Sequence, residues 1–381
     1  MAGFYFCSLK MDYCPRCIAI SLRKLWFVCV FAVLSAFAVA QDSIKNYPDI
    51  FFEYQFAQLD NKTPLSIEYN QRVRKYIDLY IQDRPKDLAR YMGLSKHYFP
   101  IFEYYLDKYD LPLELKYLSV VESGLDPFAK SSSGAVGLWQ FLYNSAPMFD
   151  LTIDSYIDER RDVYKSTDAA CRYFRYLYQT FNDWHLVLAA YNGGPGVVRN
   201  AIERSGGKKN LWDILPYMPE QTQNYVPAFL AMNYLMNHAQ QHHILPNDTI
   251  FSFAGVDTIM IDYGISFQQI EAELHIPIAQ IRMLNPVYKA DLIPGGKKFP
   301  LVLPSNLIIP YFKLENRIVT GDTIKAKEVK ARKLIYNVEK GDFLHKIALK
   351  FNCNPQEIKA WNHLTSDFIA PGQALVIWIT N

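Results

Sequence analysis

The sequence has little cysteine where a folded domain would use it. Of six cysteines, four lie at or before Cys29, and only Cys171 and Cys353 follow. Two distant thiols exclude the disulfide framework that holds many small secreted domains together. Cys14 and Cys17 have the C-x-x-C spacing of a redox or metal pair. They lie in a segment that export would remove, so we interpret this spacing as coincidence.

The sequence also lacks an excess of charge of either sign. Lys and Arg number 40 and Asp and Glu 38, for a formal net charge of +2. Because nucleic-acid binding depends on clustered Lys and Arg, we expect no nucleic-acid partner. The chain is instead rich in aromatic residues, with 27 Tyr and 24 Phe. Aromatic faces suit the apolar face of a pyranose ring, so sugars are a reasonable ligand class.

The apolar run near the N-terminus is short for a membrane span. Leu25 to Val39 covers about 15 residues, whereas a spanning helix needs roughly 20. The run follows three basic residues and ends in Ala38-Val39-Ala40, which is the pattern of a secretory signal peptide. We predict a signal peptide over residues 1–40, cleaved after Ala40, and an exported protein that is periplasmic or associated with the cell envelope. An uncleaved anchor is the alternative.

The remaining chain divides into a helical part and a part with short strands. Apolar residues recur at helical spacing from Ile67 to about His238, with Pro and Gly breaks such as Asp83-Arg84-Pro85. We therefore predict a mainly α protein, with an N-terminal helical extension over 41–90 packed on a helical domain over 91–245.

A repeat with a constant offset of 77 residues follows. Gly264 aligns with Gly341, Asn285 with Asn362, and Pro294-Gly295 with Pro371-Gly372. Each copy predicts strand, helix, helix and strand, giving two small α+β (βααβ) modules over 256–305 and 334–381. The charged segment between them, 306–333, is predicted to be a partly extended linker.

The segment from Glu114 to Leu125 carries the main candidate for chemistry. It predicts a helix over Leu113 to Ser123 that ends at Gly124, with Glu122 in the last turn. The negative end of the helix dipole and partial burial both raise the pKa of a carboxyl group at such a position. A raised pKa suits a general acid near neutral pH. A solvated Glu at a fraying helix end is the alternative on this segment alone.

Three further motifs follow Glu122-Ser123 in a fixed order: Gly137-Leu138-Trp139-Gln140, Ala190-Tyr191-Asn192-Gly193-Gly194 and Tyr225-Val226-Pro227. With this order the chain resembles the goose-type lysozyme and Slt-type lytic transglycosylase superfamily, and within it the membrane-bound lytic murein transglycosylase D group. The resemblance covers roughly Tyr69 to Met236 and implies a lysozyme-like helical catalytic domain.

The resemblance also implies roles for single residues. Glu122 is expected to be the catalytic acid and base, with Tyr225 behind it to hold it in place. The expected substrate-binding residues are Ser131, Ser133, Gln140, Tyr191 and Asn192. Trp139, between Leu138 and Phe141, is expected in the core.

No second carboxylate stands out for catalysis. Asp126 is expected to terminate the helix, and the acids of the stretch from Asp158 to Asp162 are interleaved with Arg160 and Arg161, which favours ion pairing. The family reaction needs a single acid. Glu122 protonates the oxygen between N-acetylmuramic acid and N-acetylglucosamine, then withdraws a proton from the C6 hydroxyl, which closes on C1 to a 1,6-anhydro product. No metal and no organic cofactor are expected.

The repeats resemble LysM modules, which bind N-acetylglucosamine-containing glycans. In the second copy the resemblance assigns glycan contacts to Gly341, Asp342, Asn362, Pro371 and Gly372. The first copy has Tyr263-Gly264-Ile265 in place of Lys340-Gly341-Asp342, which puts its sugar binding in doubt and leaves a structural spacer as the alternative.

The expected partners are peptidoglycan glycan strands, with no obligate protein partner. A hydrolytic goose-type lysozyme-like muramidase has the same fold and the same Glu, and a non-catalytic wall-binding protein is the alternative from another class. The sequence motifs favour the transglycosylase.

Overall fold

The structure is a computed structural model, and it describes residues 47–249, 251–319 and 332–379. The predicted signal peptide lies outside the described residues. The helical part comprises α2 (Asp49–Asp60), α3 (Gln71–Asp78), α4 (Pro85–Lys108), α5 (Lys116–Ser123), α6 (Val163–Phe181), α7 (Trp184–Gly193), α8 (Pro195–Arg204), α9 (Leu211–Ile214) and α10 (Glu220–His238). None of the described helices combines the length and the apolar character that a membrane span requires.

Helix boundaries follow the local chemistry of the sequence. Pro85 and Pro195 each occupy the first turn of a helix, where the missing N–H of proline has no cost. Asp162 begins α6, and its Oδ1 accepts hydrogen bonds from the backbone N–H groups of Tyr164 and Lys165 at 2.9 and 2.8 Å. Asp162 therefore caps α6. The sequence had predicted ion pairing for this stretch and not a helix cap.

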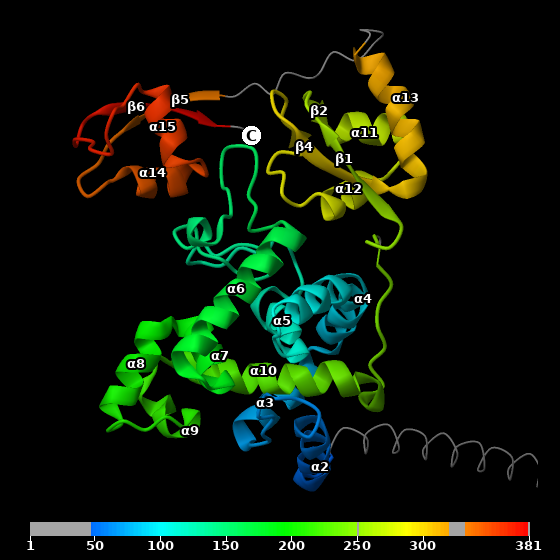
Figure 1. Ribbon diagram of the computed structural model, residues 1–381, viewed down its shortest axis with the longest axis vertical. Coiled ribbons are helices and arrows are strands. Elements are labelled where there is room, and N and C mark those ends of the chain that lie inside the picture. The colour runs from blue at the N-terminus through cyan, green and yellow to red at the C-terminus, as the bar shows by residue number, and fades with distance from the viewer. Residues whose placement is uncertain (1–46, 250, 320–331, 380–381) are drawn as a thin grey trace, which may run out of the picture. The chain divides into compact units, whose positions relative to one another are not determined.

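Helix α10 forms the centre of the bundle. It contacts α3, α5 and α7 (Figure 1), and most of its residues from Tyr225 to Leu235 are buried. The Tyr234 ring stacks on Phe56 with ring centroids 5.4 Å apart. A helix that is apolar on all sides needs neighbours on all sides, so α10 fixes the places of the helices around it.

A segment beyond α10 also belongs to the helical part. The N–H of Asn247 donates to the carbonyl oxygen of Ala89 at 2.9 Å, and His97 and Thr249 make a 2.5 Å hydrogen bond. The Phe251 ring packs against the Tyr98 ring, with the ring centroids 5.8 Å apart. The chain therefore lies along α4 as far as Phe253, beyond the boundary at residue 245 that the sequence predicts.

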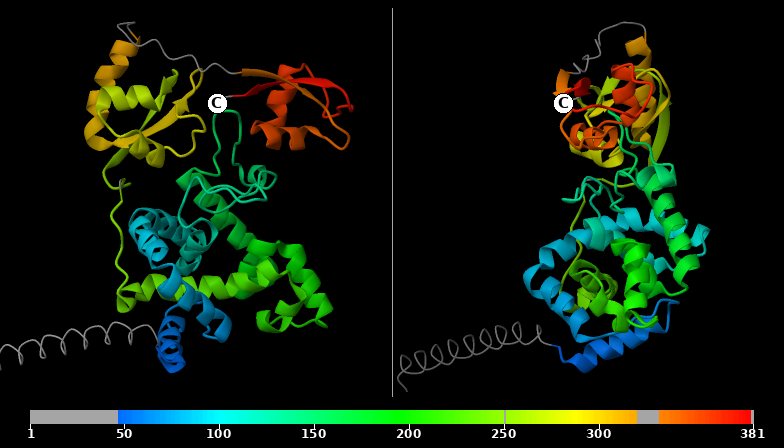
Figure 2. Two further views of the ribbon diagram at one scale, coloured as in Figure 1. Left: turned by 180° about the vertical axis from the view of Figure 1, so that it is seen from behind. Right: turned by 90° about the vertical axis from the view of Figure 1, so that its left-hand side faces the viewer.

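Two modules with strand pairs follow, and the predicted fold class is confirmed. In the first, β1 (Val256–Ile261) pairs antiparallel with β4 (Phe299–Pro304), and β2 (Ile265–Ser266) with β3 (Leu292–Ile293). Its helices are α11 (Phe267–Leu274) and α12 (Ile278–Leu284). In the second, β5 (Arg332–Asn337) pairs antiparallel with β6 (Ala374–Ile379), and the helices are α14 (Leu344–Phe351) and α15 (Pro355–Trp361) (Figure 2).

The aligned asparagines hold the same position in both modules. The Asn285 Nδ2 donates to the carbonyl oxygens of Ile281 and Val302, and its Oδ1 accepts from the N–H of Val302. Asn362 makes the same three bonds, to Ile358 and Val376. Each side chain thus ties the second helix of its module to the last strand, which is a structural reason for the repeat.

The expected linker is partly helical. Residues Ile308–Val319, predicted as part of an extended segment, form helix α13. Its Tyr311 and Leu314 are buried in the core of the first module, and the hydroxyls of Tyr263 and Tyr311 are 2.6 Å apart. The segment 306–333 was predicted as a linker because it is charged, and this prediction did not take account of the apolar side of the helix.

The close approach of the segment after α10 requires a glycine in α4. A Cβ at Gly93 would collide with the carbonyl oxygen of Asn247. We expect Gly93→Ala to detach this segment and lower the free energy of unfolding by about 1–3 kcal/mol, the usual cost of overpacking. Thermal unfolding and limited proteolysis near Asn247 are the measurements. Gly196→Ala is the matched control, because nothing lies near the added Cβ in α8. Equal stability of both variants would contradict the packing role.

Candidate active site

Glu122 lies in the last turn of α5, as predicted from the sequence. The helix starts later than expected, because Leu113–Leu115 forms a 3-10 turn before it. It ends at Gly124, whose φ of 60° is left-handed. A Cβ there would lie 2.6 Å from the Tyr91 ring, so glycine is required both by the backbone and by its neighbour.

The carboxylate of Glu122 is held by a tyrosine of α10. The Tyr225 hydroxyl donates a short hydrogen bond to Glu122 Oε1. Burial raises the pKa of Glu122 from its ordinary 4.5 to about 7, and the hydrogen bond from Tyr225 acts in the opposite direction. This environment differs from that of a solvated Glu at a fraying helix end, and it leaves the group able to give and take a proton near neutral pH.

Tyr225 itself remains a hydrogen-bond donor over a wide pH range. Its side chain is buried, and burial raises its pKa well above the ordinary value, with a further contribution from the nearby Glu122 charge. The hydroxyl thus keeps its proton while Glu122 changes protonation state. The place behind Glu122 that the resemblance implied matches this geometry.

The Gly137-Leu138-Trp139-Gln140 motif is joined to α5 by two serines. Ser119 Oγ and Ser123 Oγ both donate to the carbonyl oxygen of Leu138, at 2.9 and 3.1 Å. Trp139 is fully buried, and its Nε1 donates to Thr167 Oγ1 at 3.0 Å. Trp139 is therefore a core residue, as expected, and it fixes the loop that carries Gln140.

Tyr191 lies near Glu122 and contacts this loop. Its hydroxyl donates to the carbonyl oxygen of Trp139 at 2.7 Å. Burial raises the pKa of Tyr191 well above its ordinary value, and the Glu122 charge adds to this effect. Glu122, Tyr191 and Tyr225, which the sequence separates widely, thus share one site, in which Tyr225 is buried and the other two are partly buried.

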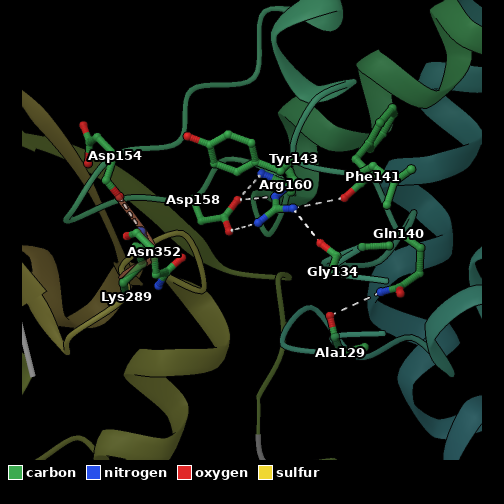
Figure 3. Close-up of polar contacts among 12 residues, drawn as sticks. Ala129, Gly134, Gln140, Phe141, Tyr143, Asp154, Asp158, Arg160, Lys289 and Asn352 are labelled. Carbon is green, nitrogen blue, oxygen red and sulfur yellow. Dashed lines mark hydrogen bonds and ion pairs between the residues drawn. The ribbon is translucent and has the colours of Figure 1, made fainter. Parts of the chain in front are cut away.

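Gln140 has a left-handed backbone, with φ of 50°. Its Nε2 donates to the carbonyl oxygen of Ala129 at 3.2 Å (Figure 3). It also donates to the carbonyl oxygen of Gly137 at 2.9 Å. The amide nitrogen therefore holds the loop closed. Any contact of Gln140 with sugar falls to its Oε1.

A buried arginine clamps the same loop. Arg160 forms a two-pronged ion pair with Asp158, with contacts of 2.9 and 2.7 Å, and donates to the carbonyl oxygens of Gly134 and Phe141 at 3.1 and 3.2 Å (Figure 3). The side chains of Arg160 and Asp158 are 4% and 1% exposed. The sequence predicted ion pairing here but missed that the pair shapes the loop carrying Ser131, Ser133 and Gln140.

The other predicted substrate-binding residues differ in their exposure. Ser131 Oγ accepts from the N–H of Ala135 at 3.0 Å and so stabilises the loop, whereas Ser133 is exposed. Asn192 Oδ1 accepts from Thr222 Oγ1 at 3.1 Å. Asp126 Oδ1 accepts from the N–H of Phe128 at 2.9 Å, which fits a helix terminator. In the described ranges no three His, Cys, Asp or Glu side chains are grouped to hold a metal ion.

In the second module the predicted glycan contacts are largely engaged in the fold. Asp342 accepts from the Tyr336 hydroxyl at 2.6 Å and pairs with Lys346 at 2.8 Å, and these contacts lower its pKa. Asn362 is the helix-to-strand tie described above. Gly341 and Gly372 have φ of 87° and 84°, and Pro371 precedes the second of them.

Comparison with known families assigns the parts of the chain. Residues 99–213 match the transglycosylase SLT domain, 255–318 the LysM-like domain of lytic transglycosylase MltD, and 336–378 the LysM domain. Membrane-bound lytic murein transglycosylase D of Escherichia coli (strain K12) is 26% identical over 332 residues, which cover 84% of this chain and 72% of that relative.

Matches to soluble transglycosylases are confined to smaller regions. Soluble lytic murein transglycosylase of Escherichia coli (strain K12) is 33% identical over 116 residues, 29% of this chain and 18% of the relative. The solved 70 kDa soluble lytic transglycosylase of Escherichia coli has 24% identity and a TM-score of 0.33, covering 45% of this chain and 29% of that one. The chain thus spans less than a third of that solved protein.

The matches to the family models and to the membrane-bound relative make the chain a lytic murein transglycosylase with LysM domains. In the order of its three domains it is similar to membrane-bound lytic murein transglycosylase D, as the sequence motifs predicted.

The raised pKa of Glu122 has a consequence for stability. Between pH 4.5 and about 7 the folded chain holds a proton on Glu122 that the unfolded chain has lost, so the contribution of this group to stability falls as pH rises. We expect Glu122→Gln to raise the free energy of unfolding at about pH 8, by up to about 3 kcal/mol, and to change little at about pH 4. Denaturant unfolding at both pH values tests this, with exposed Glu203→Gln as the control. An equal gain at both values would exclude the pKa shift as its cause.

Proposed function

We propose that Glu122 is the single acid and base of a non-hydrolytic cut in peptidoglycan glycan strands, at the β-1,4 bond between N-acetylmuramic acid and N-acetylglucosamine. The observation that carries the proposal is the carboxylate of Glu122 at the end of α5, held by Tyr225 and with a pKa near 7. Burial raises the pKa, and the hydrogen bond from Tyr225 limits the shift. A general acid that is half protonated near neutral pH can serve in both steps of a reaction.

The proposed reaction runs in two steps. Protonated Glu122 gives its proton to the glycosidic oxygen as the bond to C1 breaks, and the N-acetyl oxygen of the substrate stabilises C1. The Glu122 carboxylate then takes the proton of the C6 hydroxyl, whose oxygen bonds to C1. The product ends in 1,6-anhydromuramic acid, water is not consumed, and Glu122 returns to its protonated form. The proposed substrate contacts are Ser131, Ser133, Gln140, Tyr191 and Asn192.

Two alternatives are less well supported. A hydrolytic muramidase would use water in the second step, but the relatives that the chain matches are named transglycosylases. A non-catalytic wall-binding protein would not need a buried carboxyl group with a raised pKa, since its burial costs free energy.

The LysM domain of residues 336–378 binds peptidoglycan. We assign the contact to glycan strands, with the backbone around Gly341 and around Pro371-Gly372 as the recognising surface, because the Asp342 and Asn362 side chains are engaged within the module. Export with cleavage after Ala40, and an envelope location, are part of the same proposal, since the polymer lies outside the cytoplasm.

The products of the reaction distinguish the candidate functions. We expect the chain to release fragments from purified sacculi that end in anhydromuramic acid and are lighter by one water than hydrolytic products. Glu122→Gln should release none while it remains folded, and Glu203→Gln should act like the wild type. Mass spectrometry of the soluble fraction is the measurement. Reducing ends would favour the muramidase, and release by Glu122→Gln would remove Glu122 from its role.

The LysM domains should raise activity on insoluble wall by tethering. A chain ending after Phe253 keeps the segment that covers α4 and should cut soluble glycan fragments as the full chain does. Its release of fragments from intact sacculi should fall, because the local concentration of enzyme on the polymer is lower. Rates on both substrates give the comparison, and thermal unfolding controls for stability. Equal rates on sacculi would count against a targeting role for the modules.

A further inference from the structure

A cavity lies in the helical part, away from Glu122. Its volume is about 750 Å³, and its lining includes Leu113, Glu114, Arg175, Tyr178, Gln179 and Trp184. Leu113 and Glu114 belong to the turn that begins α5, whereas Glu122 lies at the other end of that helix. At 1.5 Å per residue the two glutamates are separated by roughly 12 Å along the axis. The cavity is therefore distinct from the candidate active site.

One wall of the cavity is aromatic. Trp184 and Tyr178 are stacked with ring centroids 4.2 Å apart and an angle of 22° between the planes. The side chain of Leu113 is 42% exposed beside them. The Arg175 guanidinium lies 5.5 Å from the centroid of the Tyr109 ring. Apolar surface that remains accessible in a concave site is typical of ligand binding.

Four polar side chains around this wall are available for contacts with a ligand. In the described parts of the chain, none of Lys62, Glu114, Arg175 and Gln179 makes a side-chain hydrogen bond or an ion pair. Donors and acceptors are thus both available next to an aromatic face. The charges are also balanced, with Lys62 and Arg175 against Asp110 and Glu114, which favours a neutral ligand over an anion.

We propose that this cavity is a second saccharide site, which takes an N-acetylhexosamine unit of the wall polymer. The choice of polymer rests on the proposed function, because the same wall would supply both the cut strand and the strand held here. A pyranose ring would lie against the Trp184 and Tyr178 side, with hydroxyl and acetamido groups directed to Gln179, Glu114 and Arg175. The site would hold the catalytic domain on the wall independently of the LysM domains.

The test follows the indole N–H of Trp184 by NMR in full-length Glu122→Gln, titrated with chitotetraose. The Trp184 signal is assigned with Trp184→Phe. We expect it to shift saturably, and Gln179→Ala and Glu114→Ala each to weaken binding several-fold at this site. Tyr104→Ala removes an exposed aromatic outside the cavity and should change nothing. Gln179 is exposed, so thermal unfolding of its variant should match the parent.

The outcomes separate this proposal from the others. Trp361 and Trp378 of the LysM domain serve as internal positive controls, and a shift confined to them would overturn the second site. A Trp184 shift with a wall stem peptide but not with chitotetraose would replace the saccharide by a peptide and overturn the proposal too. Binding is read without catalysis, so a failure of the Glu122 mechanism leaves this result unaffected.

Discussion

The hydrogen bond from Tyr225 to Glu122 is the interaction on which the rest of the site depends. A carboxyl group at a buried helix end is disfavoured when it is charged. The Tyr225 hydroxyl offsets part of that cost and keeps the charged form within reach of neutral pH. Because Tyr225 belongs to α10, the packing of α10 against α5 sets the protonation behaviour of Glu122. The bundle thus determines the chemistry through one side chain.

The loop that carries Gln140 is held by a buried ion pair, and burying the two charges costs free energy. The Arg160–Asp158 pair is nearly fully buried, and desolvation cancels much of the attraction between two such charges. The pair holds Arg160 in place, and Arg160 in turn donates hydrogen bonds to the carbonyl oxygens of Gly134 and Phe141 in the loop. Gly137 lets the Arg160 backbone approach so closely that a Cβ would collide with it. These contacts fix the backbone of the loop that carries Gln140.

Local chemistry made much of this predictable from the sequence. Pro and Gly breaks such as Asp83-Arg84-Pro85 marked helix boundaries, Gly124 marked the end of α5, and four ordered motifs pointed to Glu122 and its neighbours. The features that escaped prediction depend on contacts between distant residues. Arg160 acts on carbonyl oxygens, which have no sequence pattern. The segment to Phe253 was placed outside the helical domain because its close contact, with Gly93 in α4, lies far away in the sequence. Helix α13 was predicted as linker because the segment is charged, although Tyr311 and Leu314 reach the core.

The departure of the first module from the LysM pattern has a structural cause. Tyr263 aligns with Lys340 of the second module, and its hydroxyl contacts Tyr311 of α13. In the first copy this loop therefore holds helix α13. The corresponding loop of the second copy is Lys340-Gly341-Asp342. In the second copy the same loop has no such helix to hold among the described residues. The repeat preserves what folding needs, the Asn285 and Asn362 ties, and varies at the loop. The two copies therefore differ at the loop to which the resemblance assigns sugar contacts.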